Sequence, residues 1–156
     1  LFDLLTSEED EEDRMTRRLR FDIGLLAERL VGATDWVTEQ EETRDLALGY
    51  FGASTGSAAA MVAAGERPNA VRAVVSRGGR PDLVEAILPE VKAPVLLIVG
   101  GNDAAVIEMN KRASDALTCE KRMEIVPGAT HLFEEPGALE RVAQLAGEWF
   151  EKRLTP

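Results

Sequence analysis

The sequence contains very little of the chemistry that builds metal or disulfide sites. Among 156 residues there is one cysteine, Cys119, and one histidine, His131. A single cysteine excludes an internal disulfide framework and a multi-thiolate metal site, and a single histidine leaves few routes to a histidine-based metal cluster. We therefore expect a protein that works without a bound metal or other cofactor.

Long apolar segments and an excess of positive charge are also missing. No apolar run approaches the ~20 residues that a membrane-spanning helix needs. Residues 1–5 lead into acidic sequence and not into the cleavage site of a signal peptide, so a cytoplasmic location is the default expectation. Lys and Arg number 18 against 28 Asp and Glu, which gives a net charge of −10. Because binding to phosphate-rich surfaces depends on clustered cationic side chains, neither nucleic acid nor a membrane is expected as the main partner.

What the sequence does contain fits one folded domain. Hydrophobic residues make up 45% and charged residues 29% of the chain, which is typical of a globular protein. The length suits a single domain over residues 1–156, and neither an internal repeat nor a linker divides it.

Strand and helix patterns alternate along the chain. The apolar run 1–5 is a candidate strand, the acidic segment 6–13 is expected to be a solvated loop or a first helical turn, and 22–40 has the spacing of an amphipathic helix. The further expected strands are 46–51, 71–76, 95–99 and 123–126, and the further expected helices are 54–64, 81–88, 105–117 and 138–154. This alternation predicts an α/β fold whose mainly parallel sheet has helices on both faces.

A Gly-x-Ser-x-Gly motif, Gly52-Ala-Ser-Thr-Gly56, stands between an expected strand and an expected helix. A sharp turn there would strain the backbone of Ser54 and expose its hydroxyl above the sheet. The two glycines remove side chains that would collide with the neighbouring strand and helix, and the positive end of the helix favours negative charge at Ser54. The alternative is a small-residue turn that only allows close packing. The motif is neither a Walker loop, since no Gly-Lys-Ser/Thr follows, nor a dinucleotide fingerprint, since the glycine spacing differs.

Two more polar residues follow later strands. Asp103 comes just after the apolar strand 95–99, where α/β sheets build sites, although an aspartate there also suits the cap of the next helix. His131 follows the last expected strand, and a lone histidine is more often an ordinary polar residue. The order Ser…Asp…His, each after a successive strand, is nevertheless the order of a hydrolase triad.

Three stretches together resemble the α/β-hydrolase superfamily and, within it, the dienelactone hydrolase-like enzymes. They are Gly49-Tyr-Phe-Gly-Ala-Ser-Thr-Gly56, Ala93-Pro-Val-Leu-Leu-Ile-Val-Gly-Gly-Asn-Asp103 and Val126-Pro-Gly-Ala-Thr-His-Leu-Phe133, which look like the nucleophile, acid and histidine segments. The likeness covers about residues 46–154 and is softer before that, where 1–5 looks like the fourth strand of the family fold. It implies a serine hydrolase of the carboxylesterase type, acting on small carboxylic esters or lactones.

Two departures from that family pattern qualify the resemblance. Dienelactone hydrolase itself uses a cysteine nucleophile, whereas position 54 here is Ser54. The first three strands of the family fold have no counterpart, so the expected fold is a truncated one. In the family, the loop after the third strand supplies one of the two backbone N–H groups of the oxyanion hole, so this donor is expected to be missing too. The donor that remains is the N–H of Thr55. We expect weak activity on small activated esters.

Other residues are candidates for substrate contacts. Arg77 and Arg80 could hold a substrate carboxylate or phosphate, although pairing with nearby acids or solvent is the simpler interpretation. Leu132 and Phe133, beside His131, could line an acyl pocket.

The missing strands also predict a partner. The strand at 46–51 would expose unpaired backbone groups unless 1–5 slides beside it, so a homodimer that buries this surface is expected. The alternative to a small-molecule esterase is a non-catalytic truncated hydrolase that acts as a dimerisation or ligand-binding module. A transferase that passes the acyl group to another acceptor is the third possibility.

Overall fold

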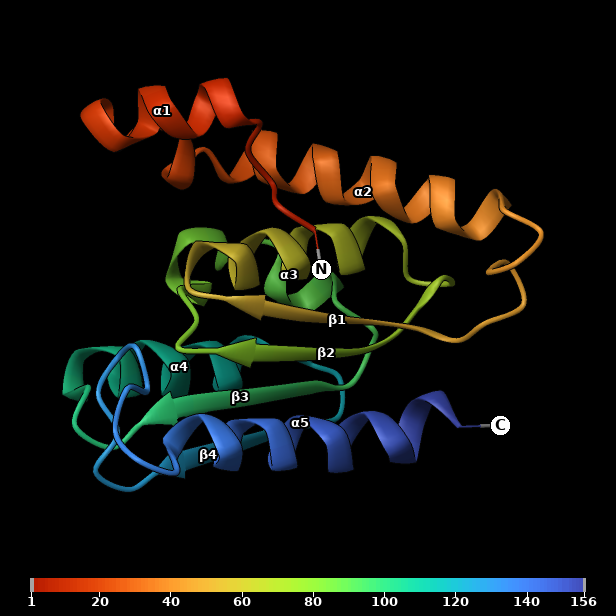
Figure 1. Cartoon of the computed structure of the whole chain (residues 1–156). Coiled ribbons are helices and arrows are strands. Elements are labelled where there is room, and N and C mark those ends of the chain that lie inside the picture. The colour runs from red at the N-terminus through yellow and green to blue at the C-terminus, as the bar shows by residue number, and fades with distance from the viewer. Residues whose placement is uncertain (1, 156) are drawn as a thin grey trace.

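The computed structural model describes residues 2–155, which form a four-stranded sheet flanked by helices (Figure 1). The strands lie in the order β1-β2-β3-β4 and all pairs are parallel; they are β1 (Leu48–Ala53), β2 (Val71–Arg77), β3 (Val95–Gly100) and β4 (Lys121–Val126). The helices are α1 (Ser7–Thr16), α2 (Ile23–Glu39), α3 (Thr55–Glu66), α4 (Ala104–Ala116) and α5 (Ala138–Leu154). No helix among the described residues combines the length and apolar character that crossing a bilayer requires. The expected α/β fold with a parallel sheet is confirmed.

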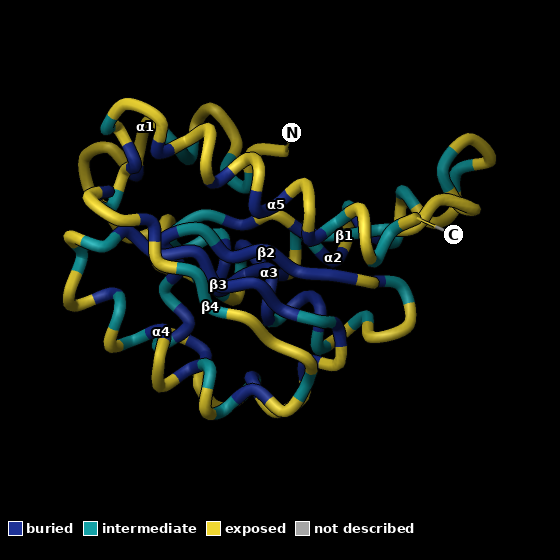
Figure 2. Tube along the Cα trace, turned by 90° about the horizontal axis from the view of Figure 1, so that it is seen from below, coloured by how far each residue is buried: buried dark blue, intermediate teal, exposed yellow. Residues whose placement is uncertain are grey.

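Helices cover both faces of the sheet. Val74 and Leu97 pack into the core on the side of α3 and α4, whereas Val75 and Ile98 pack on the side of α5. In Figure 1 α2 lies outside α3, and α5 crosses the opposite face. All six residues of β3 are buried because this strand has a neighbour on each side and helices above and below; its dark trace is seen in Figure 2.

The N-terminal part differs from its prediction. Residues 2–5 form no strand, and the guanidinium of Arg29 in α2 donates a hydrogen bond to the Leu4 carbonyl (2.8 Å). The acidic segment expected to be a loop or a first turn belongs to α1. Thr6 and Glu9 form a capping box at the start of α1, and the Glu9 carboxylate pairs with both Nη atoms of Arg29. This hydrogen-bonded pair lowers the pKa of Glu9 to about 2, so α1 is held on α2 by charge pairing between residues far apart in sequence.

A second difference concerns the segment 81–88, which was expected to be a short helix. The structure has two 3-10 turns instead, Pro81–Val84 and Leu88–Glu90. Pro81 and Pro89 each lie in the first positions of their turn, where the missing N–H of a proline costs no helical hydrogen bond.

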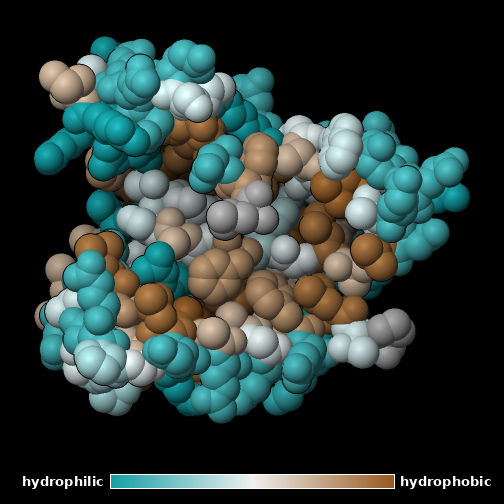
Figure 3. Space-filling model, viewed as in Figure 1, coloured by the Kyte–Doolittle hydropathy of each residue, from teal (hydrophilic) through white to brown (hydrophobic). Residues whose placement is uncertain are grey.

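The two edges of the sheet differ in chemistry. β4 carries Lys121, Arg122 and Glu124, the kind of charged edge that discourages further pairing. β1 has no charged residue, and no strand among residues 2–155 pairs with its outer edge. A groove of about 1170 Å³ runs along β1, lined in part by Phe2, Leu4, Leu30, Leu48 and Phe51. Figure 3 shows apolar side chains gathered on this face, between α2 and α5.

We propose that a second copy of the chain covers the edge of β1. Sedimentation velocity should then give a mass of about 34 kDa, twice the 17.0 kDa of one chain. Phe51→Lys places a charge on this edge, where Phe51 is 50% exposed, and should return the protein to the monomer mass. Ile125→Lys makes the same change at a 45% exposed residue of β4 and should leave the dimer intact. A monomeric wild-type protein would contradict the proposal.

Candidate active site

Ser54 occupies the turn between β1, which ends at Ala53, and α3, which begins at Thr55. Its backbone has φ 50° and ψ −121°, a positive φ that residues other than glycine seldom adopt. Two backbone hydrogen bonds hold it in this conformation: Ser54 N–H donates to the Arg77 carbonyl (3.1 Å), and Arg80 N–H donates to the Ser54 carbonyl (3.2 Å). The surroundings therefore fix a strained serine at the carboxyl end of β1.

The two glycines of the motif have different roles. A Cβ at Gly52 would lie 2.6 Å from the Gly56 carbonyl oxygen and 2.6 Å from Ser57 Cα, so only glycine lets α3 start so close to β1. A Cβ at Gly56 would meet nothing within 4 Å. The steric explanation therefore holds for Gly52 and fails for Gly56.

Asp103 serves two structures at once. It lies after β3 at the N-cap of α4, and its Oδ1 accepts a hydrogen bond from Val106 N–H (3.5 Å). Its Oδ2 lies 2.8 Å from Nδ1 of His131. The helix cap and the partner of the histidine, which the sequence presents as alternatives, use one oxygen each.

The imidazole of His131 lies close to Gly78, in the chain segment whose backbone also binds Ser54. A Cβ at Gly78 would lie 3.5 Å from both Cε1 and Nδ1 of this ring, and Gly78 follows Arg77, whose carbonyl binds Ser54 N–H. The bond to Asp103 occupies Nδ1 and leaves Nε2 available. Between residues 2 and 155 no hydrogen bond joins the Ser54 hydroxyl to the ring, so the structure brings Asp103 and His131 into direct contact and links Ser54 to them through the backbone of residues 77–78.

Thr55, expected as an oxyanion donor, is the first residue of α3. The first N–H groups of a helix have no intrahelical acceptor, and the helix dipole adds positive potential there. This N–H therefore has the position and polarity to meet a negatively charged oxygen beside Ser54.

The four proposed substrate-contact residues have unequal surroundings. The Arg80 guanidinium makes two 2.9 Å hydrogen bonds to Asp82, which raise the pKa of Arg80 and lower that of Asp82. Arg77 lies 5.6 Å from the centroid of the Phe133 ring and donates to the Leu132 carbonyl (3.4 Å). Phe133 is fully buried, whereas Leu132 is exposed. Arg77 thus keeps a polar group, and Leu132 an apolar group, open to a ligand. Arg80 is instead paired with Asp82, and Phe133 packs in the core.

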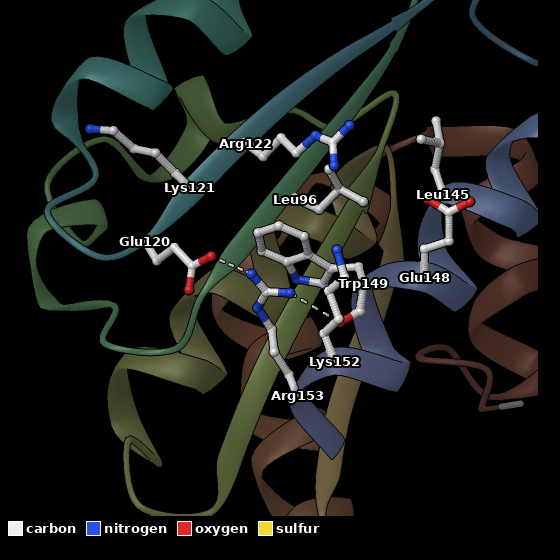
Figure 4. Close-up of a pocket in the computed structure, with 9 residues that line it drawn as sticks. All are labelled: Leu96, Glu120, Lys121, Arg122, Leu145, Glu148, Trp149, Lys152 and Arg153. Atoms are coloured by element: carbon white, nitrogen blue, oxygen red, sulfur yellow. Dashed lines mark hydrogen bonds and ion pairs between the residues drawn. The ribbon is translucent and has the colours of Figure 1, made fainter. Parts of the chain in front are cut away.

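A separate pocket of about 320 Å³ lies between the start of β4 and the end of α5, and contains none of the candidate catalytic residues (Figure 4). Its Arg153 stacks 3.4 Å from the ring centroid of Trp149 and pairs with Glu120. Arg122 pairs with Glu124. Both guanidinium groups of this pocket therefore already have carboxylate partners.

The sequence alone did not identify the importance of Gly78. This residue directly follows β2, has φ 53° and lies against the imidazole of His131. A glycine directly after a strand is too common a signal to separate this role from an ordinary turn.

Comparison with known proteins relates most of the chain to one family. The model of the family described as "Dienelactone hydrolase family" matches residues 5–153. A crystal structure of dienelactone hydrolase from Anabaena variabilis ATCC 29413 is 65% identical, with a TM-score of 0.95 over 98% of this chain and 71% of that one. Est1E from Butyrivibrio proteoclasticus, 17% identical with a TM-score of 0.71 over 83% of this chain and 70% of that one, shares the fold.

Longer relatives carry a different name. "Putative phosphoribosyl transferase Rv0571c" from Mycobacterium tuberculosis H37Rv is 56% identical over 154 residues, which are 99% of this chain and 34% of that protein. The corresponding protein MT0597 of strain CDC 1551 gives the same identity and the same coverage. The chain therefore spans about a third of the length of these curated relatives.

Proposed function

Because this chain belongs to the dienelactone hydrolase family, we propose that it is a serine hydrolase that cleaves small carboxylic esters or lactones with Ser54, His131 and Asp103. The observation that carries the proposal is the 2.8 Å contact between Asp103 Oδ2 and His131 Nδ1, beside the strained turn of Ser54. All three residues follow parallel strands at the same edge of the sheet, where parallel α/β folds bind ligands, and this supports the proposal.

In the proposed mechanism His131 Nε2 takes the proton of the Ser54 hydroxyl while Ser54 Oγ attacks the ester carbonyl. Asp103 fixes the tautomer of the imidazole and stabilises its protonated form. The tetrahedral intermediate collapses to an acyl-enzyme as His131 returns the proton to the leaving alcohol. Water, deprotonated by His131, then releases the acid and restores Ser54.

The oxyanion donors limit the substrates. Thr55 N–H supplies one hydrogen bond to the developing negative charge, beside the positive end of α3. Loss of one donor from such a site raises the barrier by about 3 kcal/mol. Activated esters depend less on these donors than amides do, because their leaving groups depart more readily. We therefore propose small activated esters and lactones as the substrate class.

The name of the longer Mycobacterium relatives is compatible with this proposal. A protein about three times as long has room for a transferase activity elsewhere in its chain. We propose that the part matching this chain contributes an ester hydrolase site of its own.

Hydrolysis of p-nitrophenyl acetate and butyrate by the wild type, Ser54→Ala and His131→Ala tests the proposed function. We expect release of nitrophenol by the wild type only, because either substitution removes the nucleophile or its base. A fluorophosphonate probe should label Ser54, as seen by mass spectrometry of the peptide that contains it. Equal nitrophenol release by all three proteins, with no labelling of Ser54, would favour the non-catalytic module.

A further inference from the structure

The segment 77–80 touches the elements that carry all three proposed triad residues. Arg77 and Arg80 bind the backbone of Ser54 on both sides, through its N–H and its carbonyl. Gly78 lies against the ring and the carbonyl of His131. The position of the imidazole relative to Ser54 therefore depends on where this segment lies.

One side chain of α3, that of Ser57, holds the segment 77–80 through hydrogen bonds. The hydroxyl of Ser57 donates to the Ser54 carbonyl (2.7 Å) and accepts the N–H of Arg80 (3.2 Å). Ser57 is 1% exposed, so water does not compete for these bonds. A single hydroxyl thus joins the nucleophile turn to the end of the segment.

A side chain of α4, that of Asn110, also holds the segment 77–80. Asn110 Nδ2 donates to the Gly79 carbonyl (3.0 Å) and to the Val106 carbonyl one turn earlier (2.9 Å). α4 is the helix whose N-cap, Asp103, holds the imidazole. The His131 ring and the segment 77–80 are therefore both held by the same helix, the ring by its N-cap residue and the segment by Asn110.

Neither contact is explained by packing alone. Asn110 is fully buried, and its Oδ1 is among the buried side-chain atoms without a hydrogen-bond partner. Such an atom lowers stability relative to an apolar side chain of the same shape. Gly79 itself lies close to two hydroxyl groups, since a Cβ there would lie 2.0 Å from Ser76 Oγ and 2.4 Å from Ser57 Oγ, and the position therefore admits only glycine.

We infer that Ser57 and Asn110 are positioning residues, which clamp the segment 77–80 so that the His131 imidazole is held against the Ser54 turn. This inference rests on the proposed function, and it adds two residues that touch neither the substrate nor the reacting atoms. Loss of either bond lets the segment relax, and a misplacement of about 1 Å at a catalytic group can cost on the order of a hundredfold in rate.

The test uses Ser57→Ala and Asn110→Leu, which remove the hydrogen bonds and keep most of the volume. With p-nitrophenyl acetate we expect kcat to fall about 10- to 100-fold while KM stays within about twofold. His131 is the only histidine, so its imidazole proton signals in NMR spectra are identified without assignment. These signals should shift or broaden in both variants.

Thr34→Val is the matched control. Thr34 is 3% exposed and its hydroxyl bonds to the Leu30 carbonyl (2.8 Å) and to Tyr50 Oη (2.6 Å), away from the segment 77–80. This variant should lose stability with unchanged kcat and unchanged His131 signals. If Ser57→Ala and Asn110→Leu behave in the same way, the inference is overturned.

The readouts separate this inference from the proposed function. Hydrolysis that does not depend on Ser54 would end the proposed function, whereas the His131 signals would still decide whether the two residues hold the ring. Shifted or broadened signals in both folded variants support the clamp, and signals unchanged from the wild type in either folded variant overturn it. If one variant does not fold, the other decides.

Discussion

Asp103→Asn is expected to lower kcat for p-nitrophenyl acetate about 10⁴-fold while the midpoint of thermal unfolding stays close to that of the wild type. The two oxygens of Asp103 do different work: Oδ1 caps α4 through Val106 N–H, and Oδ2 meets Nδ1 of His131. Asparagine keeps an oxygen for the cap. It removes the negative charge that stabilises the protonated imidazole and disturbs the tautomer, which in serine triads costs about 10⁴ in rate.

Asp103→Ala should show both losses, the fall in kcat and a destabilisation of about 0.5–2 kcal/mol from the missing cap. Asp22 provides the matched control, since it caps α2 in the same way by accepting from Leu25 N–H (3.1 Å). Asp22→Ala should lose stability with no change in kcat. Wild-type activity in Asp103→Asn would reduce Asp103 to a helix cap and remove the acid from the proposed triad.

The parts of the fold that the sequence predicts well are those whose burial has a simple period. The apolar run 95–99 is confirmed as the buried centre of β3, and the expected helix 138–154 has the bounds of α5, because one stripe of apolar residues faces the sheet. For the acidic segment 6–13 the sequence predicts only a loop or a first helical turn, because the ion pair of Glu9 with Arg29 that holds α1 joins residues 20 positions apart. No local pattern in the sequence reports such a pair.

The candidate site likewise contains residues that the sequence predicts and residues that it does not. Ser54, Asp103 and His131 are predicted as site residues from motif and chain order, because each follows a strand and parallel strands end at the same edge of the sheet. Ser57 and Asn110 are not found, since both act on backbone carbonyls and N–H groups of a neighbouring loop. Any residue type can supply those backbone groups, so the sequence contains no signal of the contact.

Gly52→Ala is the second substitution with a large expected effect. The added Cβ would lie 2.6 Å from two backbone atoms of α3, the Gly56 carbonyl oxygen and Ser57 Cα, and no flexible side chain can move aside to relieve the contact. Forcing extra volume into a packed site costs about 1–3 kcal/mol. For a domain of this size that cost corresponds to a fall of roughly 2–12 °C in the unfolding midpoint.

The same displacement should also reduce ester hydrolysis, because α3 can move away from β1 only by changing the turn at Ser54 that joins them. Gly56→Ala is the control within the same motif: nothing lies within 4 Å of its Cβ position, and alanine is the better helix former. Scanning calorimetry should give an unchanged or slightly raised midpoint for this variant. Equal midpoints for the two variants would show that α3 is not seated on β1 through Gly52, and the strained backbone of Ser54 would then need another cause than the close approach of strand and helix.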